Sequence, residues 1–251
     1  MTLAPNLTEI VFALGGEGQL AAVSDYSDYP PAARALPRLG GLDASAERIV
    51  SLHPDLVLAS RDGNPRGAVR AVEASGIPVL TVSGESLDAV LDGIRQVGRR
   101  LGRSEEAERL AASLAARRAA VARRIAGASR PGAILLAWPD PPQAAGGGTF
   151  LSDVLEEAGA RNLLGGRSGW PVVSAEFLAT APIDVLVLPD SPETRGIYER
   201  ARQSGALSRG SAAKARVIRL DEGALTRPGP RVFDALEDLA RQLHPAPGES
   251  P

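Results

Sequence analysis

Cysteine and histidine, two residue types that often carry out catalysis or hold metals, are absent or rare in this sequence. Cysteine is absent, which excludes disulfides, thiolate metal sites and thiol catalysis. Of the two histidines, His53 lies at a predicted helix end before Pro54, and His244 lies beside the C-terminal tail. Neither has a metal-binding spacing such as HxH or HExxH, and no GxSxG, kinase or paired-carboxylate motif is present. The sequence therefore predicts a protein that is not an enzyme, with no metal site and no intrinsic cofactor.

One glycine-rich segment supports a different class of function. Gly146, Gly147 and Gly148 precede Thr149 and a predicted helix over 150–158, where backbone amides could hold a phosphate group. The segment lacks the lysine of a P-loop and the spacing of a dinucleotide-binding motif. We expect a flexible loop that lines a cleft. An intracellular α/β enzyme acting on a phosphorylated substrate is the alternative.

The aromatic residues indicate ligand binding. They make up only 4% of the chain, and several of them lie in loops that follow predicted strands, namely Tyr26, Tyr29, Trp138 and Trp170. Tryptophan and tyrosine usually pack in a core. A parallel sheet, however, presents its ligand-binding residues in the loops after its strands. We therefore expect these aromatic side chains to line a cleft.

Short apolar runs alternate with helical patterns along the chain, which is typical of parallel βαβ units. Residues 86–101 read as a helix, with Ser86 as its N-cap and apolar residues on one face. The expected strands are Leu20–Val23, Leu56–Ala59, Val79–Val82, Ala133–Ala137, Val185–Leu188 and Val217–Leu220.

A longer helix is predicted over 104–126. This segment has no glycine or proline, and its first turns are acidic while its last turn holds Arg123 and Arg124, an order that suits the helix dipole. At 1.5 Å per residue the helix is about 35 Å long. It reads either as a rigid spacer between two lobes or as a long helix lying across one domain.

An internal repeat favours two lobes. Residues 46–58 read AERIVSLHPDLVL and residues 175–188 read AEFLATAPIDVLVL. Both contain Ala-Glu, apolar helix positions, then proline, aspartate and a strand. The two copies flank the long helix, which suggests the same unit in each lobe.

The overall composition restricts the partners. The chain has 251 residues with a net charge of −2, so we expect no nucleic-acid binding. No apolar run approaches the roughly 20 residues needed to span a membrane. No signal peptide is visible, which leaves open both removal of an export signal and a location inside the cell.

Several segments together resemble the helical-backbone periplasmic binding proteins, specifically the cobalamin-binding components of ABC importers. The resemblance covers Thr2 to about Leu243 and includes TLAPNLTEIVFALG, VSDYSDYPPAA, LGGLDASAERIVSLHPDLVLA, GIPVL, GWPVVSAEFL and RPGPR. It implies an α/β fold with two lobes, each a parallel sheet flanked by helices, joined by one long rigid helix, with the ligand cleft between the lobes. The expected boundaries are 1–103 for the N-terminal lobe, 104–128 for the helix, 129–245 for the C-terminal lobe and 246–251 for a disordered tail.

The resemblance also implies roles for single residues. Tyr26 matches a tyrosine that contacts the corrin, Trp170 matches a tryptophan of the C-terminal lobe wall, and Arg227 matches an arginine near the ligand's polar side chains. Asp221 or Glu222 would be its acidic partner. Where relatives can have aromatic residues, this chain has Gly41, Ser60 and Gln143, and Trp138 lies nearby. The expected ligand-binding residues are thus Tyr26, Gly41, Leu42, Ser60, Trp138, Gln143, Trp170, Asp221 and Arg227.

Two glutamates at equivalent places in the repeat, Glu47 and Glu176, match the surface pair with which such proteins dock onto arginines of the membrane permease. The alternative is that they are ordinary first-turn acids favoured by the helix dipole.

The resemblance thus implies a monomeric periplasmic or cell-surface-tethered protein that captures cobalamin or a related corrinoid and delivers it to an ABC permease dimer. A haem or ferric-siderophore binder of the same fold is the alternative within this class.

Overall fold

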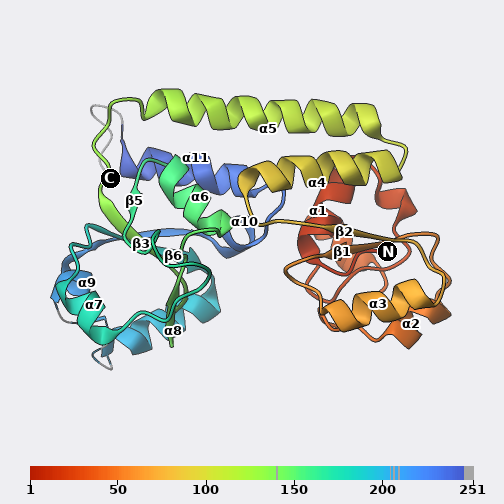
Figure 1. Ribbon diagram of the computed structural model, residues 1–251, viewed down its shortest axis with the longest axis horizontal. Coiled ribbons are helices and arrows are strands. Elements are labelled where there is room, and N and C mark those ends of the chain that lie inside the picture. Colours follow the sequence, from red (N-terminus) through yellow and green to blue (C-terminus); the bar gives the residue numbers. More distant parts are fainter. Residues whose placement is uncertain (140, 204, 206, 209, 246–251) are drawn as a thin grey trace. The chain divides into compact units, whose positions relative to one another are not determined.

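The computed structural model describes residues 1–139, 141–203, 205, 207–208 and 210–245, and the expected tail 246–251 lies outside them. The chain divides into two compact α/β units (Figure 1). Unit 1 comprises Met1–Ala115 and Pro228–Pro230, and unit 2 comprises the remainder of the chain. The expected boundaries differ from this division, since Pro228–Pro230 belong to unit 1 and the long helix is shared between the units.

The first unit is built around a small parallel sheet. Strands β1 and β2 pair in parallel from Val57↔Val79 to Ser60↔Val82. In Figure 1, α3 lies on one side of these strands, and α1 and α4 lie on the other. Its elements are α1 (Pro5–Ala13), the 3-10 helices η1 (Glu17–Gln19) and η2 (Pro31–Ala35), α2 (Ala46–Ser51), β1 (Val57–Ser60), α3 (Arg66–Ala74), β2 (Val79–Val82) and α4 (Leu87–Arg100).

Single-residue bridges widen this sheet beyond the expected strands. Thr2 pairs in parallel with Leu58 on one side and with Val23 on the other, and Val23 pairs with Arg38. The expected strand Leu20–Val23 is therefore reduced to a bridge at Val23. The physical reason is local, because the Leu20 amide donates to the Glu17 carbonyl oxygen and closes the η1 turn instead of joining the sheet.

The second unit holds a larger, mostly parallel sheet in the order β4-β3-β6-β7, with β5 beside β3. Strand β4 is antiparallel to β3, whereas β5, β6 and β7 run parallel to their neighbours. Its elements are β3 (Gly132–Pro139), β4 (Pro142–Ala144), α6 (Phe150–Glu157), β5 (Arg161–Asn162), α7 (Ala175–Thr180), β6 (Val185–Asp190), α8 (Pro192–Gln203), α9 (Gly210–Lys214), β7 (Arg216–Asp221), α10 (Glu222–Thr226) and α11 (Val232–Leu243).

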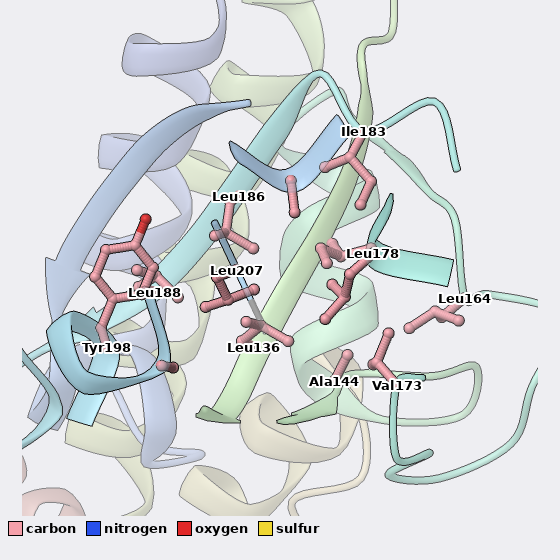
Figure 2. Close-up of a cluster of buried hydrophobic side chains, with 13 residues drawn as sticks. Leu136, Ala144, Leu164, Val173, Leu178, Ile183, Leu186, Leu188, Tyr198 and Leu207 are labelled. Carbon is pink, nitrogen blue, oxygen red and sulfur yellow. The ribbon is translucent and has the colours of Figure 1, made fainter. Parts of the chain in front are cut away.

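Both faces of this sheet are covered, which explains its continuous apolar strands. Helix α8 packs on β3 and β6, while α6 packs on β3 and α11 packs on β7. Figure 2 shows one face of the core, where Leu136, Leu178 and Leu186 point into the same cluster, and all three are at most 1% exposed. Each such side chain contributes about 1.5–3 kcal/mol of burial free energy.

Helix α5 (Ser104–Arg124) confirms the long helix predicted over 104–126. In unit 1, Gly98 of α4 allows close approach to α5, since an added Cβ there would lie 2.2 Å from the Cβ of Ala107. In unit 2, the guanidinium of Arg117 donates to Glu237 at 2.8 and 2.7 Å and to Asp234 at 2.6 Å. These hydrogen bonds lower the pKa of Glu237 and raise that of Arg117. The helix is thus anchored separately in each unit.

No helix among the described residues is long and apolar enough to cross a membrane. Unit by unit, the α/β architecture with parallel sheets flanked by helices agrees with the prediction from the sequence.

Candidate ligand-binding site

Tyr26 lies at the exposed tip of a tight turn in unit 1. The Ser27 amide donates to the Ser24 carbonyl oxygen at 3.0 Å, which closes a turn with Asp25 and Tyr26 at its centre. The side chain of Tyr26 is 56% exposed although it is a large aromatic residue. Its ring lies beside Gly41, because an added Cβ at Gly41 would be 3.7 Å from Cε2 of Tyr26. The structure therefore brings two expected site residues into contact.

A buried asparagine ties the other two expected residues of unit 1 to each other. The Nδ2 of Asn64 donates to the Leu42 carbonyl oxygen at 2.8 Å, and its Oδ1 accepts from the Ser60 amide at 2.8 Å. Ser60 itself is 4% exposed, and its hydroxyl accepts from the Gly63 amide at 3.2 Å. Ser60 thus supports the loop more than it offers surface to a ligand. The sequence did not single out Asn64, because Leu42 and Leu3, whose carbonyl oxygens accept from its Nδ2, lie far away along the chain.

Unit 2 presents an exposed apolar surface built on backbone pairing. Trp138 on β3 is opposite Gln143 on β4, and Gln143 is bridged to Val172 on its other side. Residues directly opposite in a sheet share one face. Trp138 and Val172 are 45% and 57% exposed, and Trp170, two residues before Val172, is 44% exposed. We call Trp138, Gln143, Trp170 and Val172 the tryptophan surface.

The segment 165–171 holds the tryptophan surface in place through its contacts with the glycines at 146 and 147. The Gly146 amide donates to the Gly169 carbonyl oxygen at 2.8 Å, and the Gly147 amide donates to that of Arg167 at 2.7 Å. An added Cβ on Gly146 would lie 2.1 Å from the Arg167 oxygen, so only glycine permits this approach. Thr149 caps α6 by accepting from the Ser152 amide.

These contacts correct the interpretation of Gly146–Gly148 as a flexible cleft-lining loop. They also weaken the phosphate-binding alternative, since the amides of Gly146 and Gly147 already donate to carbonyl oxygens.

Asp221 has a local role that the sequence did not reveal. Its carboxylate accepts from the Ala224 amide at 2.7 Å, which caps α10, and it pairs with Arg231 at 3.2 Å. Asp221 thus forms an ion pair with Arg231, which the sequence did not single out. Arg227 is half-buried at the end of α10 and directly precedes Pro228–Pro230 of unit 1.

The two glutamates expected to dock occupy matching positions. Ser45 caps α2 by accepting from the Arg48 amide at 3.2 Å, and Ser174 caps α7 by accepting from the Phe177 amide at 3.1 Å. Glu47 and Glu176 are each the second residue after these serines, and both are exposed. The repeat therefore extends to the cap and the first turn of each helix.

Metal ligands are not gathered anywhere in the part of the chain that the structure describes. His53 ends the α2 region with a left-handed backbone (φ 46°), and the Nε2 of His244 lies 3.3 Å from the Gly159 carbonyl oxygen. Both histidines thus lie at the ends of helices, as the sequence predicts.

Comparison with known proteins assigns the fold. The family model described as "Periplasmic binding protein" matches residues 1–224. This chain belongs to the periplasmic binding protein family.

Several relatives are similar over nearly their whole length. The vitamin B12-binding protein of Photorhabdus laumondii is 30% identical over 97% of this chain and 87% of its own. The periplasmic haem-binding protein RhuT from Roseiflexus sp. RS-1 has a TM-score of 0.86 and 30% identity over 97% of this chain and 96% of its own. The periplasmic vitamin B12-binding protein BtuF of Vibrio cholerae has a TM-score of 0.83 and 27% identity over 96% and 94%. The family and its fold are those of binding proteins, which agrees with the absence of catalytic motifs in the sequence.

Proposed function

We propose that this chain is the substrate-binding component of an ABC importer and that its substrate is cobalamin or a related corrinoid. The observation that carries the proposal is the exposure of large aromatic side chains in both units, Tyr26 in a turn of unit 1 and Trp138, on β3, and Trp170 in unit 2. A flat macrocycle presents broad apolar faces, and aromatic rings provide large contact areas for such faces. The vitamin B12-binding relatives support the choice of a corrinoid.

The expected ligand-binding residues divide between the units. Tyr26, Gly41 and Leu42 would contact the ligand from unit 1, with Ser60 supporting their loops. Trp138, Gln143 and Trp170 would contact it from unit 2, together with the polar residues Asp221 and Arg227. That one ligand contacts both units stays a prediction.

Calorimetric titration of the purified protein with cyanocobalamin tests the proposal. We expect saturable binding of about one ligand per chain. Haemin and a ferric siderophore are titrated in parallel as competitors for the assignment. Absence of binding to cyanocobalamin together with binding of haemin would transfer the function to haem capture, for which the similarity to RhuT is the supporting observation.

The proposal extends to delivery. Glu47 and Glu176 project from matching capped helices, one in each unit, and would dock onto arginines of the two related permease subunits. Exposed ion pairs contribute about 0.2–1 kcal/mol each, so these contacts would set orientation more than affinity. In this scheme the protein acts as a monomer in the periplasm or tethered to the cell surface, and α5 forms the backbone between 103 and 129.

A further inference from the structure

A chain of four buried hydroxyl groups lies beneath the Tyr26 turn. Thr2, Thr8, Ser24 and Ser27 are each at most 1% exposed, yet the residues around them form the core of unit 1. Burying a hydroxyl without a hydrogen-bond partner costs about 1–3 kcal/mol, so such a cluster persists only where the hydroxyls satisfy one another.

Thr8 is the centre of this cluster. Its Oγ1 lies 2.7 Å from Oγ1 of Thr2 and 2.7 Å from Oγ of Ser27, and Ser27 lies 3.0 Å from Oγ of Ser24. Thr8 Oγ1 also donates to the Ala4 carbonyl oxygen at 3.4 Å. One arrangement places all four protons in hydrogen bonds: Thr8 donates to Ala4, Thr2 and Ser27 donate to Thr8, and Ser24 donates to Ser27.

The cluster joins the Tyr26 turn to α1. Ser24 and Ser27 are the first and last residues of the turn, and Thr8 lies on α1, nineteen positions from Ser27. The turn is therefore held to a helix by side-chain hydrogen bonds that reach from its two ends into the core.

A second set of contacts holds the same turn from its other side. The Nη1 of Arg38 donates to the carbonyl oxygens of both Ser24 and Ser27, at 2.9 and 2.8 Å. The Asp25 amide donates to the Gly40 carbonyl oxygen at 2.8 Å, and the Gly40 amide donates to Oδ1 of Asp25 at 3.0 Å. The ends of the turn, Ser24 and Ser27, are buried, whereas the Tyr26 side chain at the tip is 56% exposed.

We propose that Thr8 is a positioning residue for ligand binding. Through Ser27 it holds the Tyr26 turn in one conformation, so that the aromatic ring is presented before the ligand arrives and little conformational entropy is lost on binding. The inference rests on the proposed function in that Tyr26 contacts the ligand. Thr8 itself is buried and acts only through the turn.

Thr8→Val tests this role, because valine keeps the shape of threonine and removes only the hydroxyl. The affinity for cyanocobalamin is measured by calorimetry for Thr8→Val and for the rescue variant Thr8→Ser, each in the wild-type and Tyr26→Ala backgrounds. We expect Thr8→Val to weaken binding about 3- to 10-fold, the value of one net hydrogen bond, and Thr8→Ser to restore most of it. In the Tyr26→Ala background, Thr8→Val should change affinity by less than about 2-fold, since the effect passes through the ring.

A second readout does not need a ligand. Amide hydrogen exchange at residues 24–27 should be faster in Thr8→Val than in the wild type and near wild type in Thr8→Ser. Ser27→Ala, which breaks the same link from the turn, should behave like Thr8→Val. An equal loss of affinity in both Tyr26 backgrounds, or unchanged exchange at 24–27, would overturn the positioning role. If the wild type binds none of the three ligands, the proposed function fails, while the exchange measurement still decides whether Thr8 orders the turn.

Discussion

The two units hold their exposed aromatic residues in different ways. In unit 1, Tyr26 depends on side-chain hydrogen bonds, from the buried hydroxyl cluster and from Arg38. In unit 2, the tryptophan surface depends on backbone pairing and on the close approach of Gly146 to the segment 165–171, which contains Trp170. The Tyr26 turn is therefore sensitive to loss of a polar atom, whereas the tryptophan surface is sensitive to the addition of a single carbon at Gly146.

The largest expected effect is Gly146→Ala. The added methyl group would lie 2.1 Å from the Arg167 oxygen and 2.8 Å from the Gly169 oxygen, so the backbone of the 165–171 segment must move. We expect the free energy of unfolding to fall by about 2–4 kcal/mol, with an altered near-ultraviolet circular dichroism signal from Trp138 and Trp170.

Gly166→Ala is the matched control, since an added methyl group there meets nothing within 4 Å and the residue is exposed. It should change stability by less than about 0.5 kcal/mol. If Gly146→Ala is as stable as Gly166→Ala, close backbone approach does not hold the tryptophan surface.

Trp170→Ala separates binding from stability in unit 2. The side chain is 44% exposed, so its removal should leave the thermal midpoint nearly unchanged. The affinity for cyanocobalamin should fall by about 1–3 kcal/mol through loss of an aromatic contact face. A large fall in the melting temperature at constant affinity would instead assign Trp170 to the core.

A smaller effect is expected at α5, where the two units again differ. Arg117→Gln removes three hydrogen bonds to Asp234 and Glu237 in unit 2. The hydrogen bond from Arg117 holds the pKa of Glu237 below its ordinary value of 4.5. The pair therefore stabilises the folded state above pH 4.5, and this stabilisation is lost as the pH falls below 4.5.

The difference in melting temperature between the wild type and Arg117→Gln should accordingly be full at pH 7 and should shrink below pH 4.5. Arg95→Gln is the control in unit 1, where the partner Glu108 is largely exposed. If Arg95→Gln lowers the melting temperature as much as Arg117→Gln does, the exposure of an ion pair does not determine how much it contributes to stability here.

The smallest effect on ligand affinity is expected for the two glutamates that occupy equivalent positions in the two units. Glu47→Lys with Glu176→Lys should leave cyanocobalamin binding almost unchanged, because both side chains are exposed in the first turns of α2 and α7. Docking to the cognate permease should weaken, and more so at low salt, where surface charges are least screened. If the double variant transports normally, the two glutamates do not dock onto the permease and serve only as first-turn acids that stabilise their helices.

Elements with a strong local pattern could be predicted from the sequence. Strand β2 was placed at Val79–Val82 and helix α4 within 86–101, and Ser86 caps that helix as expected by accepting from the Ala89 amide. The strand expected at Leu20–Val23 was wrong, because the 3-10 turn at Glu17 uses the Leu20 amide and Thr2 joins the sheet beside Val23. Alternation and capping are local signals, whereas the pairing of Thr2 with Val23 joins residues that lie far apart in the sequence.

The candidate site shows the same limit. The sequence places Tyr26, Trp138 and Trp170 in loops after strands, and the structure corrects this for two of them. Trp138 lies on β3 itself, and the strand expected before Tyr26 is reduced to a bridge at Val23. The sequence could not show that Asn64 joins Leu42 to Ser60, nor that Asp221 pairs with Arg231. Which residues form these hydrogen bonds and ion pairs depends on their distance in space. From the sequence alone, many other polar residues of the chain could have been the partners.

The sequence by itself determined the helix within 86–101, the long helix over 104–126 and the repeated Ala-Glu start of α2 and α7, since each depends on residues within a few positions of one another. Only the tertiary structure decided which residues hold the aromatic side chains in place. Thr8 meets Ser27 and Gly146 meets Arg167 because the fold brings distant segments within hydrogen-bonding or van der Waals range. Contacts of this kind depend on close packing across the whole unit, and no local pattern of residues encodes them.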